Sequence, residues 1–310
     1  MIIIIGAGWY GLYLAHKLQS MNKDYIVYEK ETNIFCGASG FNQNRLHLGF
    51  HYPRSFHTRS QARKGFHKFK LNFPELTMPV IDNIYAVHKN SIIDFETYKS
   101  IFKYEKYDFQ VHENLDVNFQ GCIATNEEVI SSKKAIKFFE DQNLNIEYNS
   151  ECVLEGKSLY VNGIKKKFDR LFDCSWGSIN KRPYYNEEIF TTVLLEAKGE
   201  INFGALTIMD GDFYSIYPTD KGKNLYTLTS VKYGVTIDSA EKSADKTWLN
   251  FNSEFRDIAS QFMPIGFFSS RKMKPKEYSS RRTVDIYSNG NIHHVFAGKI
   301  DTIFELDTLL

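Results

Sequence analysis

The 310-residue sequence predicts an α/β fold in which a parallel βαβ unit comes first and a mixed or antiparallel sheet is inserted later. The first observation is an apolar run, residues 2–5, that leads directly into a glycine-rich turn. The second is a series of short apolar runs between 190 and 232, which is typical of an antiparallel sheet. A chain of this length can bury a large core, and without a repeat or a linker we expect two interleaved subdomains.

The glycine-rich turn has the spacing of a Rossmann-like nucleotide site. The run 2–5 suits a parallel strand that is covered on both faces. Gly6 permits the tight turn, Gly8 lets backbone amides approach phosphates, and Gly11 lets the following helix lie close to the strand. The positive N-terminus of that helix then faces a diphosphate. The expected cofactor contacts of the turn are Gly6, Gly8, Trp9, Tyr10 and Gly11.

A second apolar run, residues 25–28, ends at Glu29. This acid follows Gly11 at the interval where a carboxylate accepts hydrogen bonds from an adenosine ribose 2′-hydroxyl. We expect Glu29 and its neighbour Lys30 to line the cofactor site. NAD and FAD share that hydroxyl, so the unit alone leaves both cofactors open.

The remaining elements follow from apolar periodicity and turn residues. Apolar spacing predicts helices over 55–71, 94–102, 131–142 and 246–262. In the first of these, Ala62, Phe66 and Phe69 are expected to face inward and the basic residues to face solvent. Alternating and β-branched runs predict strands over 83–87, 145–153, 190–197, 205–209, 213–217 and 225–232, and a hairpin of 158–161 with 168–174.

A segment rich in glycine and amide side chains, residues 37–49, suits a chain that wraps closely around a diphosphate. Its hydroxyl and amide groups would donate to phosphate oxygens, and Arg45 would add a charge-assisted contact. The expected cofactor residues of this segment are Ser39, Asn44, Arg45, Leu46 and His47. The segment resembles the serine-glycine-asparagine stretch after the second strand of FAD enzymes of the D-amino-acid-oxidase type, which are glutathione-reductase-like flavoproteins.

Two later segments carry the same resemblance. Residues 172–177 look like the family's later strand, which ends in a small residue and a glycine near the cofactor. Residues 295–302 resemble the strand and glycine turn that open the helix pointing at the flavin. A helix beginning near Asp301, which we expect to cap it, would direct its dipole at reduced flavin. The resemblance implies FAD, with contacts at Val153, Ser175, Gly177, Gly298, Lys299, Ile300, Asp301 and Thr302.

A histidine-rich segment directly follows the diphosphate segment. His47, His51 and Tyr52 are placed to position a substrate or to move a proton, and Arg54 and Arg59 to hold a carboxylate or phosphate. Covalent attachment of the flavin through a histidine, or a purely loop-stabilising role, stays open. We expect no metal site, because no carboxylate or cysteine cluster lies close in the sequence.

Two tyrosines are the remaining candidates for the substrate site. The stretch 210–218 lies where an enzyme of the D-amino-acid-oxidase type has the floor of its substrate cavity. Tyr214 and Tyr217 are expected to share one face of this strand and to contact the substrate if that face looks at the flavin. Otherwise they are ordinary cross-strand tyrosines.

A second, weaker resemblance suggests a different reaction. Residues 298–307 look like the pattern near the end of UDP-galactopyranose mutases, in which reduced FAD attacks a sugar without net redox change. Arg271, Arg281 and Arg282 would then hold a diphosphate. The alternative function is therefore a flavin-dependent nucleotide-sugar mutase.

The balance of these observations favours a Rossmann-like FAD-binding domain with an inserted substrate domain of mixed or antiparallel sheet. We expect the FAD-binding domain to comprise 1–75, 122–180 and 285–310, and the substrate domain 76–121 and 181–284. The expected function is an FAD-dependent oxidoreductase that oxidises a small amine- or hydroxyl-bearing molecule by hydride transfer to the flavin. Anionic molecules and sugar derivatives are among the candidate substrates.

Composition narrows the classes of partner and the compartment. A net charge of +1 and a pI near 7.7 give no reason to expect nucleic acid or an anionic membrane as a partner. The first strand begins at residue 2, which leaves no room for a signal peptide, and the longest apolar runs are too short to span a bilayer. Four scattered cysteines without a CxxC pair favour small buried thiols and a cytoplasmic location.

Overall fold

The computed structural model describes residues 1–310 except 181–184, 212, 237, 277–283 and 297. Contacts between Cα atoms divide the chain into two units. The first unit comprises 1–41, 134–187 and 272–310, and the second comprises 42–133 and 188–271. Segments 42–75 and 122–133, which the sequence grouped with the cofactor domain, make their contacts in the second unit.

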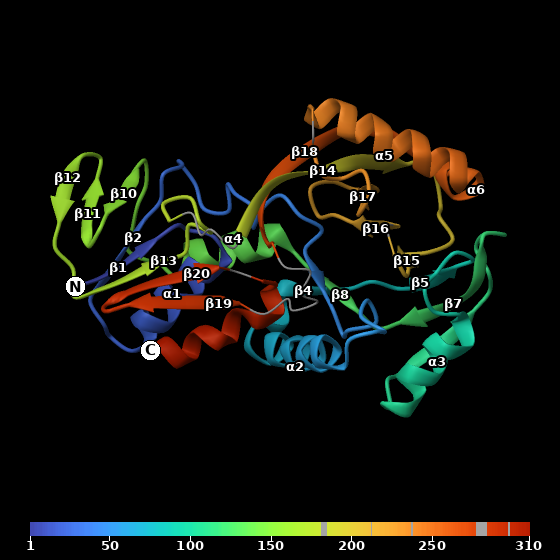
Figure 1. The fold of residues 1–310 in the computed structure, drawn as a ribbon, viewed down its shortest axis with the longest axis horizontal. Coiled ribbons are helices and arrows are strands. Elements are labelled where there is room, and N and C mark those ends of the chain that lie inside the picture. Colours follow the sequence, from blue (N-terminus) through green and yellow to red (C-terminus); the bar gives the residue numbers. More distant parts are fainter. Residues whose placement is uncertain (181–184, 212, 237, 277–283, 297) are drawn as a thin grey trace. The chain divides into compact units, whose positions relative to one another are not determined.

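The first unit is built on a six-stranded sheet in the order β19-β20-β13-β1-β2-β9 (Figure 1). Its strands are β1 (Ile2–Ile5), β2 (Tyr25–Tyr28), β9 (Ile146–Glu147), β13 (Arg170–Asp173), β19 (Asp285–Asn289) and β20 (Ile292–Phe296). All neighbours are parallel except β19 and β20. The carboxyl ends of β1, β2 and β13 therefore meet at one edge, where α/β proteins bind their ligands.

Both faces of the central strand β1 are covered, as its run of isoleucines predicts. On one face, Ile3 and Ile5 pack against Leu159 and Val161 of a small antiparallel sheet. That sheet consists of β10 (Cys152–Glu155), β11 (Ser158–Val161) and β12 (Ile164–Lys166). On the other face lies helix α1 (Trp9–Ser20), and its Trp9 ring packs on Phe139 of α4 (Ser132–Asp141).

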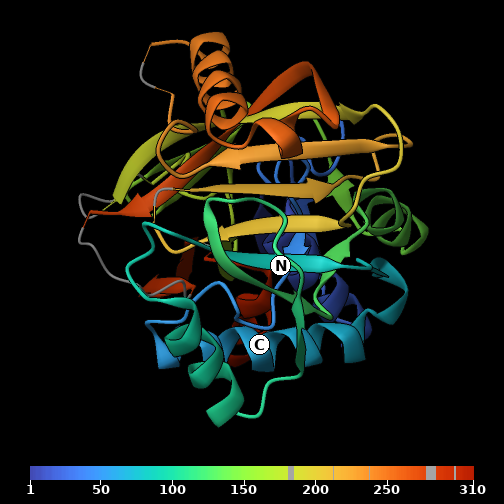
Figure 2. The same ribbon diagram turned by 90° about the vertical axis from the view of Figure 1, so that its right-hand side faces the viewer.

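The second unit is built on an eight-stranded mixed sheet in the order β18-β14-β17-β16-β15-β5-β7-β6. Figure 2 shows its central strands side by side, with α5 (Ala240–Glu254) over one face. Only β15 and β5 pair in parallel among the registers described. Its strands are β5 (Asn83–His88), β6 (Phe109–His112), β7 (Phe119–Thr125), β14 (Tyr185–Ala197), β15 (Ala205–Met209), β16 (Tyr214–Pro218), β17 (Leu225–Ser230) and β18 (Phe262–Pro275).

Alternation along β5 fills both sides of this sheet. Ile84 and Ala86 join the core formed with α5 and α6 (Arg256–Ala259). Tyr85 and Val87 point to the opposite face, where they pack with Phe50 and with α3 (Phe95–Tyr104). A sheet buried on both faces explains why every residue of β5 is buried.

A small sheet and one long helix complete the second unit. The sheet has the order β3-β8-β4 and consists of β3 (Arg45–Leu46), β4 (Thr77–Pro79) and β8 (Glu128–Ile130). Helix α2 (Phe56–Asn72) is capped by Ser55 and buries Ala62, Phe66 and Phe69, as predicted. A short 3-10 turn, η1 (Pro74–Leu76), follows α2.

Three element predictions are wrong in detail. The strand predicted over 145–153 is broken into β9 and β10, because Asn149 adopts a positive φ between them. The hairpin turn at 162–163 and the core strand within 168–174 are present, but 158–161 pairs with β12, whereas 168–174 forms the parallel strand β13. The helix predicted over 246–262 begins at Ala240, where Ser239 caps it, and Phe262 already belongs to β18.

Two findings concern the predictions from composition. Cys122 and Cys152 are buried, but Cys36 is exposed, so the prediction of small buried thiols is wrong for that residue. Among the described residues, the helices lack the combination of length and apolar character that a membrane crossing requires.

Candidate functional site

The glycine turn after β1 is held by close backbone contacts. Gly6 has a φ of 96°, which favours glycine. A Cβ on Gly11 would lie 1.9 Å from the carbonyl oxygen of Gly6, so α1 can approach β1 only with glycine there. A Cβ on Gly8 would meet only the Ser39 hydroxyl, at 2.9 Å. Gly11 is thus needed for packing, while Gly8 keeps the N-terminus of α1 accessible.

Glu29 and Ser39 are both hydrogen-bonded to this turn. The Glu29 carboxylate accepts hydrogen bonds from the N–H of Ala7 at 2.6 Å and of Glu31 at 3.0 Å. The Ser39 hydroxyl accepts one from the N–H of Trp9 at 3.0 Å. The neighbouring Lys30 is largely exposed and pairs with Glu31. The sequence motif and the serine of the following segment are therefore one local structure.

The C-terminal turn contacts the same helix. The Tyr10 hydroxyl donates to the carbonyl of Lys299 at 2.6 Å and lies 2.8 Å from the Thr302 hydroxyl. Burial raises the pKa of Tyr10 far above its usual range, so it stays a neutral donor. Gly298 comes just before this turn, and Ile300 opens the 3-10 helix η2 (Ile300–Leu309). The residue at the cap is Lys299, so the prediction that Asp301 caps this helix is wrong; Asp301 lies buried in its first turn.

The turn after β13 is the third segment at this edge. A Cβ on Gly6 would lie 3.1 Å from the carbonyl oxygen of Cys174, so this turn borders the glycine turn. The Asp173 carboxylate accepts from both the N–H and the hydroxyl of Ser175, at 3.0 and 2.5 Å. Gly177 has a φ of 75°, and the buried His294 lies 2.7 Å from Asp173. The first unit therefore brings together three segments that are far apart in the sequence.

Val153 is the one predicted cofactor residue of the first unit placed on the small sheet. It lies on β10, paired with Tyr160, and its side chain is half exposed.

The other predicted cofactor residues belong to the second unit, and their side chains are engaged there. The Asn44 amide donates to the Ser132 hydroxyl, and Leu46 is fully buried on β3. The Arg45 guanidinium donates to the hydroxyls of Ser215, Tyr85 and Thr207 at 3.2, 3.1 and 2.8 Å. It also lies 4.0 Å above the ring of Tyr217. This geometry gives no support to a diphosphate contact by Arg45.

The histidine segment forms a cluster that sequence reasoning described incompletely. The rings of His47 and His51 are 5.8 Å apart, and Tyr52 lies 5.1 Å from His51 and 6.4 Å from His47. A buried acid, Glu127, lies 3.6 Å from Nδ1 of His47. Nothing in the sequence indicated that Glu127 belongs to this cluster, because it lies after β7, more than seventy residues beyond His51.

Arg54 and Arg59 take different positions. Nε of Arg54 donates to the Asp210 carboxylate at 2.5 Å, and the arginine side chain is 56% exposed. Arg59 is buried, paired with Glu105, and donates to the carbonyls of Tyr52 and Pro53. The expectation that Arg59 faces solvent or holds a substrate anion is therefore wrong, because its donors fix the turn before α2.

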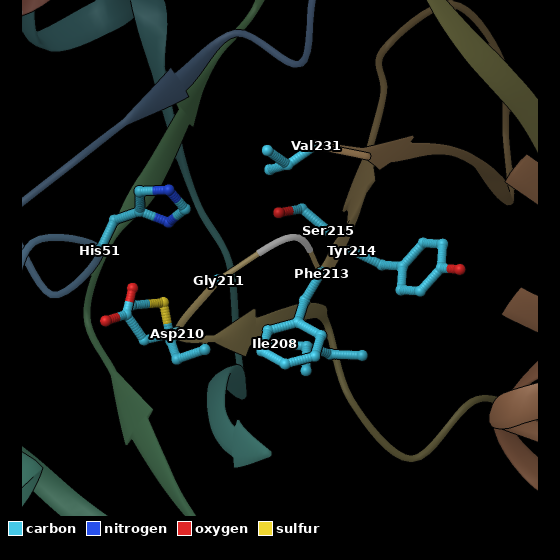
Figure 3. A pocket seen from close by; sticks show the side chains of 9 residues that line it. His51, Ile208, Asp210, Gly211, Phe213, Tyr214, Ser215 and Val231 are labelled. Carbon is cyan, nitrogen blue, oxygen red and sulfur yellow. The ribbon is translucent and has the colours of Figure 1, made fainter. Parts of the chain in front are cut away.

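A small cavity of about 30 Å³ lies beside Asp210 and His51 (Figure 3). It is large enough for about one water molecule. Ser215, Phe213 and Val231 are among its lining residues. Imidazole, carboxylate and hydroxyl groups thus border one cavity in the second unit.

The prediction that Tyr214 and Tyr217 share a face is wrong. They are three residues apart, and side chains of a strand alternate with a period of two. The Tyr214 ring packs on Phe251 and Phe255 in the core under α5. Tyr217 lies on the other face of the sheet. Its hydroxyl donates to the Asn83 side chain at 2.9 Å, and its ring lies under the Arg45 guanidinium.

The sequence predicts no metal site at the histidine segment. Within the described ranges, no group of three or more His, Cys, Asp or Glu side chains has the arrangement of a metal site.

Comparisons with known proteins identify the family. Residues 4–69 match the model of the NAD(P)-binding Rossmann-like domain. The FAD-dependent monooxygenase FPY4 of Fusarium mangiferae is 31% identical over 335 aligned residues, covering 97% of this chain and 87% of FPY4. This chain belongs to the FAD-dependent monooxygenase family of FPY4. It is an FAD-dependent enzyme of the oxidoreductase class.

One further sequence and one solved structure are similar to this chain. The FAD-dependent monooxygenase kojA of Aspergillus flavus is 41% identical over 83 residues, which are 27% of this chain and 19% of kojA. Glycine oxidase from Geobacillus kaustophilus has the same fold, with a TM-score of 0.77 at 12% identity, covering 100% of this chain and 92% of the oxidase. The predicted cofactor and the predicted D-amino-acid-oxidase-like fold of this family member are confirmed.

Proposed function

We propose that this family member oxidises a small amine- or hydroxyl-bearing molecule by transferring hydride from a substrate C–H bond to the flavin of FAD. The observation that supports this most is the meeting of three segments at one edge of the first sheet: the glycine turn, the turn after β13 and the start of η2. Glu29 adds a carboxylate for the adenosine ribose. The fold of amino-acid oxidases such as glycine oxidase supports the same chemistry.

The residues proposed to hold FAD follow from this arrangement. Backbone N–H groups at Gly8 and at the start of α1 would face the diphosphate, and the Ser39 hydroxyl would add a donor. The first turn of η2 would direct N–H groups at the flavin, where they stabilise negative charge. The proposed contacts are Gly6, Gly8, Trp9, Tyr10, Gly11, Glu29, Lys30, Ser39, Val153, Ser175, Gly177, Gly298, Lys299, Ile300, Asp301 and Thr302.

The substrate-facing residues are proposed from the second unit. Removing a hydride from carbon and a proton from the neighbouring nitrogen or oxygen leaves an imine or a carbonyl product. FAD supplies the two-electron oxidant. His47 and His51 would take up the proton, while Tyr52 and Arg54 would orient the substrate. Because Asp210 neutralises Arg54, this site favours neutral polar substrates over isolated anions.

The family name supports a second candidate, the insertion of one oxygen atom from dioxygen into the substrate. FPY4 is called a monooxygenase, and this chain covers 87% of it. Nothing in the comparisons favours the nucleotide-sugar mutase alternative, which stays a prediction. Of the arginines expected to hold its diphosphate, Arg271 lies on β18, and Arg281 and Arg282 lie outside the described residues.

Anaerobic mixing distinguishes these reactions. A panel of amines, amino acids, alcohols, sugars and nucleotide sugars is added to the oxidised holoenzyme, and flavin absorbance is followed. Direct oxidation predicts bleaching without added reductant. In a parallel aerobic assay, product formation that requires both NAD(P)H and dioxygen would favour oxygen insertion instead.

A further inference from the structure

Strand register places a buried acid beside the histidine segment. Strands β3 and β8 are antiparallel, with Arg45 opposite Val129 and Leu46 opposite Glu128. His47 and Glu127 directly follow and precede these paired residues, so the same register continued by one step would bring them opposite each other. Both side chains are buried, and Nδ1 of the imidazole lies 3.6 Å from Oε2 of the carboxylate.

The Glu127 carboxylate is surrounded by donors. One oxygen accepts from the N–H groups of Leu48 and Gly49 at 2.7 and 3.2 Å. The other accepts from the Tyr85 hydroxyl at 2.5 Å. Burial raises the pKa of Glu127, while the Arg45 charge and these donors oppose that rise. The three hydrogen bonds therefore favour a charged carboxylate at a site where an unpaired charge would be costly.

The same carboxylate determines the shape of the segment that carries the histidines. Gly49, which receives one of its hydrogen bonds, has a φ of 114°, and a Cβ there would lie 2.8 Å from the carbonyl oxygen of Arg59. The chain then continues through the buried Phe50 to His51 and Tyr52. Glu127 thus holds the backbone between the two histidines as well as facing one of them.

We propose that Glu127 is the buried counter-ion of His47, which positions the imidazole and keeps it able to hold a proton. The assignment rests on the proposed function in one respect: the proton is the one released from the substrate nitrogen or oxygen as its C–H hydride leaves. His47 accepts that proton at Nε2, the ring nitrogen remote from Glu127, and the imidazolium then faces the carboxylate. Glu127 is a positioning residue, since it acts through His47.

The other groups around His47 define the sign of the effect. His51 is close enough that a positive charge on it disfavours a second one on His47. Arg45, which donates a hydrogen bond to the Tyr85 hydroxyl, is also positively charged. Tyr52 lies beside both imidazole rings. Glu127 is the nearest charged group among the contacts described, so the carboxylate should outweigh the effects of burial and of the two cationic neighbours.

Titration of His47 in the FAD-loaded, full-length protein tests this directly. Histidine labelled with ¹³C at Cε1 is followed by NMR as pH changes, and the His47→Gln variant assigns the resonance. The wild-type pKa is expected above the ordinary value of about 6.5. Glu127→Gln is expected to lower it by about one unit or more, which is a tenfold change in proton affinity.

The adjacent acid provides a matched control. Glu128 is also a buried carboxylate of β8, but it pairs with Lys70. Glu128→Gln should leave the His47 titration unchanged. A purely structural role for Glu127 would disturb both histidines without a directed shift at His47.

Two results would overturn the proposal. One is a His47 pKa below about 6 in the wild-type protein, where burial would prevail. The other is a Glu127→Gln protein, folded by circular dichroism, whose His47 titrates as in the wild type. The wild-type titration decides the question alone if Glu127→Gln does not fold. None of these titrations requires turnover. The titrations can therefore overturn the role of Glu127 while anaerobic flavin reduction supports the proposed function, and flavin reduction can fail while the titrations support Glu127.

Discussion

The Glu29 carboxylate accepts a hydrogen bond from the Ala7 N–H at 2.6 Å, which joins the end of β2 to the glycine turn after β1. The acid is thereby held at the edge of the sheet where the nucleotide end of FAD is proposed to bind. In the proposed FAD site, its remaining acceptor capacity would serve the ribose hydroxyls.

Glu29→Ala should weaken FAD binding without unfolding the protein. Hydrogen bonds to a charged group contribute about 1.5–3 kcal/mol, so the dissociation constant should rise roughly 10- to 100-fold. Fluorescence titration of the apoprotein with FAD measures this. Lys23→Ala, at an exposed position just before β2, is the control and should bind FAD normally. Unchanged affinity in Glu29→Ala would remove the ribose assignment.

Substitutions at Gly11 and Gly8 should have different consequences. Gly11→Ala places a Cβ 1.9 Å from a backbone oxygen that cannot move independently, so about 3 kcal/mol of stability or more should be lost. In Gly8→Val the added Cβ meets only the Ser39 side chain, which can rotate, but the larger residue blocks the approach of phosphates. The folded Gly8→Val protein should therefore be colourless.

Thermal denaturation and the ratio of flavin to protein absorbance separate these two effects. Gly37→Ala, where a Cβ would meet no atom within 4 Å, is the control and should match the wild type in both. A yellow Gly8→Val preparation with full flavin content would contradict the proposed phosphate contact.

Arg59→Ala should be far more destabilising than Arg54→Ala. Arg59 is buried with Glu105 and two carbonyl partners, and removing one member of a buried pair costs about 3–5 kcal/mol. Arg54 is more than half exposed, so its pair with Asp210 contributes at most about 1 kcal/mol. Urea denaturation measures both, and equal losses would refute the distinction.

Stability should fall as pH decreases from 7.5 to 5.5, partly because of His88. Burial lowers the pKa of His88, although Glu254 opposes the effect. The folded state therefore binds fewer protons than the unfolded state below about pH 6.5, so protonation favours unfolding there. His88→Gln should flatten the dependence of the free energy of unfolding on pH. The exposed His67→Gln should not, and identical slopes for all three proteins would exclude a contribution from His88.

The sequence was sufficient for the cofactor-binding end of the fold because its signals are local. The isoleucine run, the glycine spacing and Glu29 lie within thirty residues, and each reports one backbone requirement. The turns at Ser175 and Lys299 are distant in sequence, and only the family resemblance connected them to the first turn. Their contacts with Gly6 and Tyr10 are tertiary and leave no periodic pattern.

The second unit was less predictable because its polar side chains are paired across strands. Arg45 follows a phosphate-like segment, yet its donors reach hydroxyls on β5, β15 and β16. Arg59 has the spacing of a solvated helical face, yet Glu105 and two carbonyls hold it inside. Glu127 became recognisable only when the structure placed its carboxylate 3.6 Å from the His47 ring.

The most direct test of the central proposal is the flavin spectrum of the purified holoenzyme under anaerobic conditions with the substrate panel. At least one amine- or hydroxyl-bearing compound is expected to bleach the flavin without NAD(P)H or dithionite, and air is expected to restore the colour. A compound that is converted only after the flavin has been reduced by an added reductant, with no bleaching by the compound itself, would contradict hydride transfer from substrate to flavin.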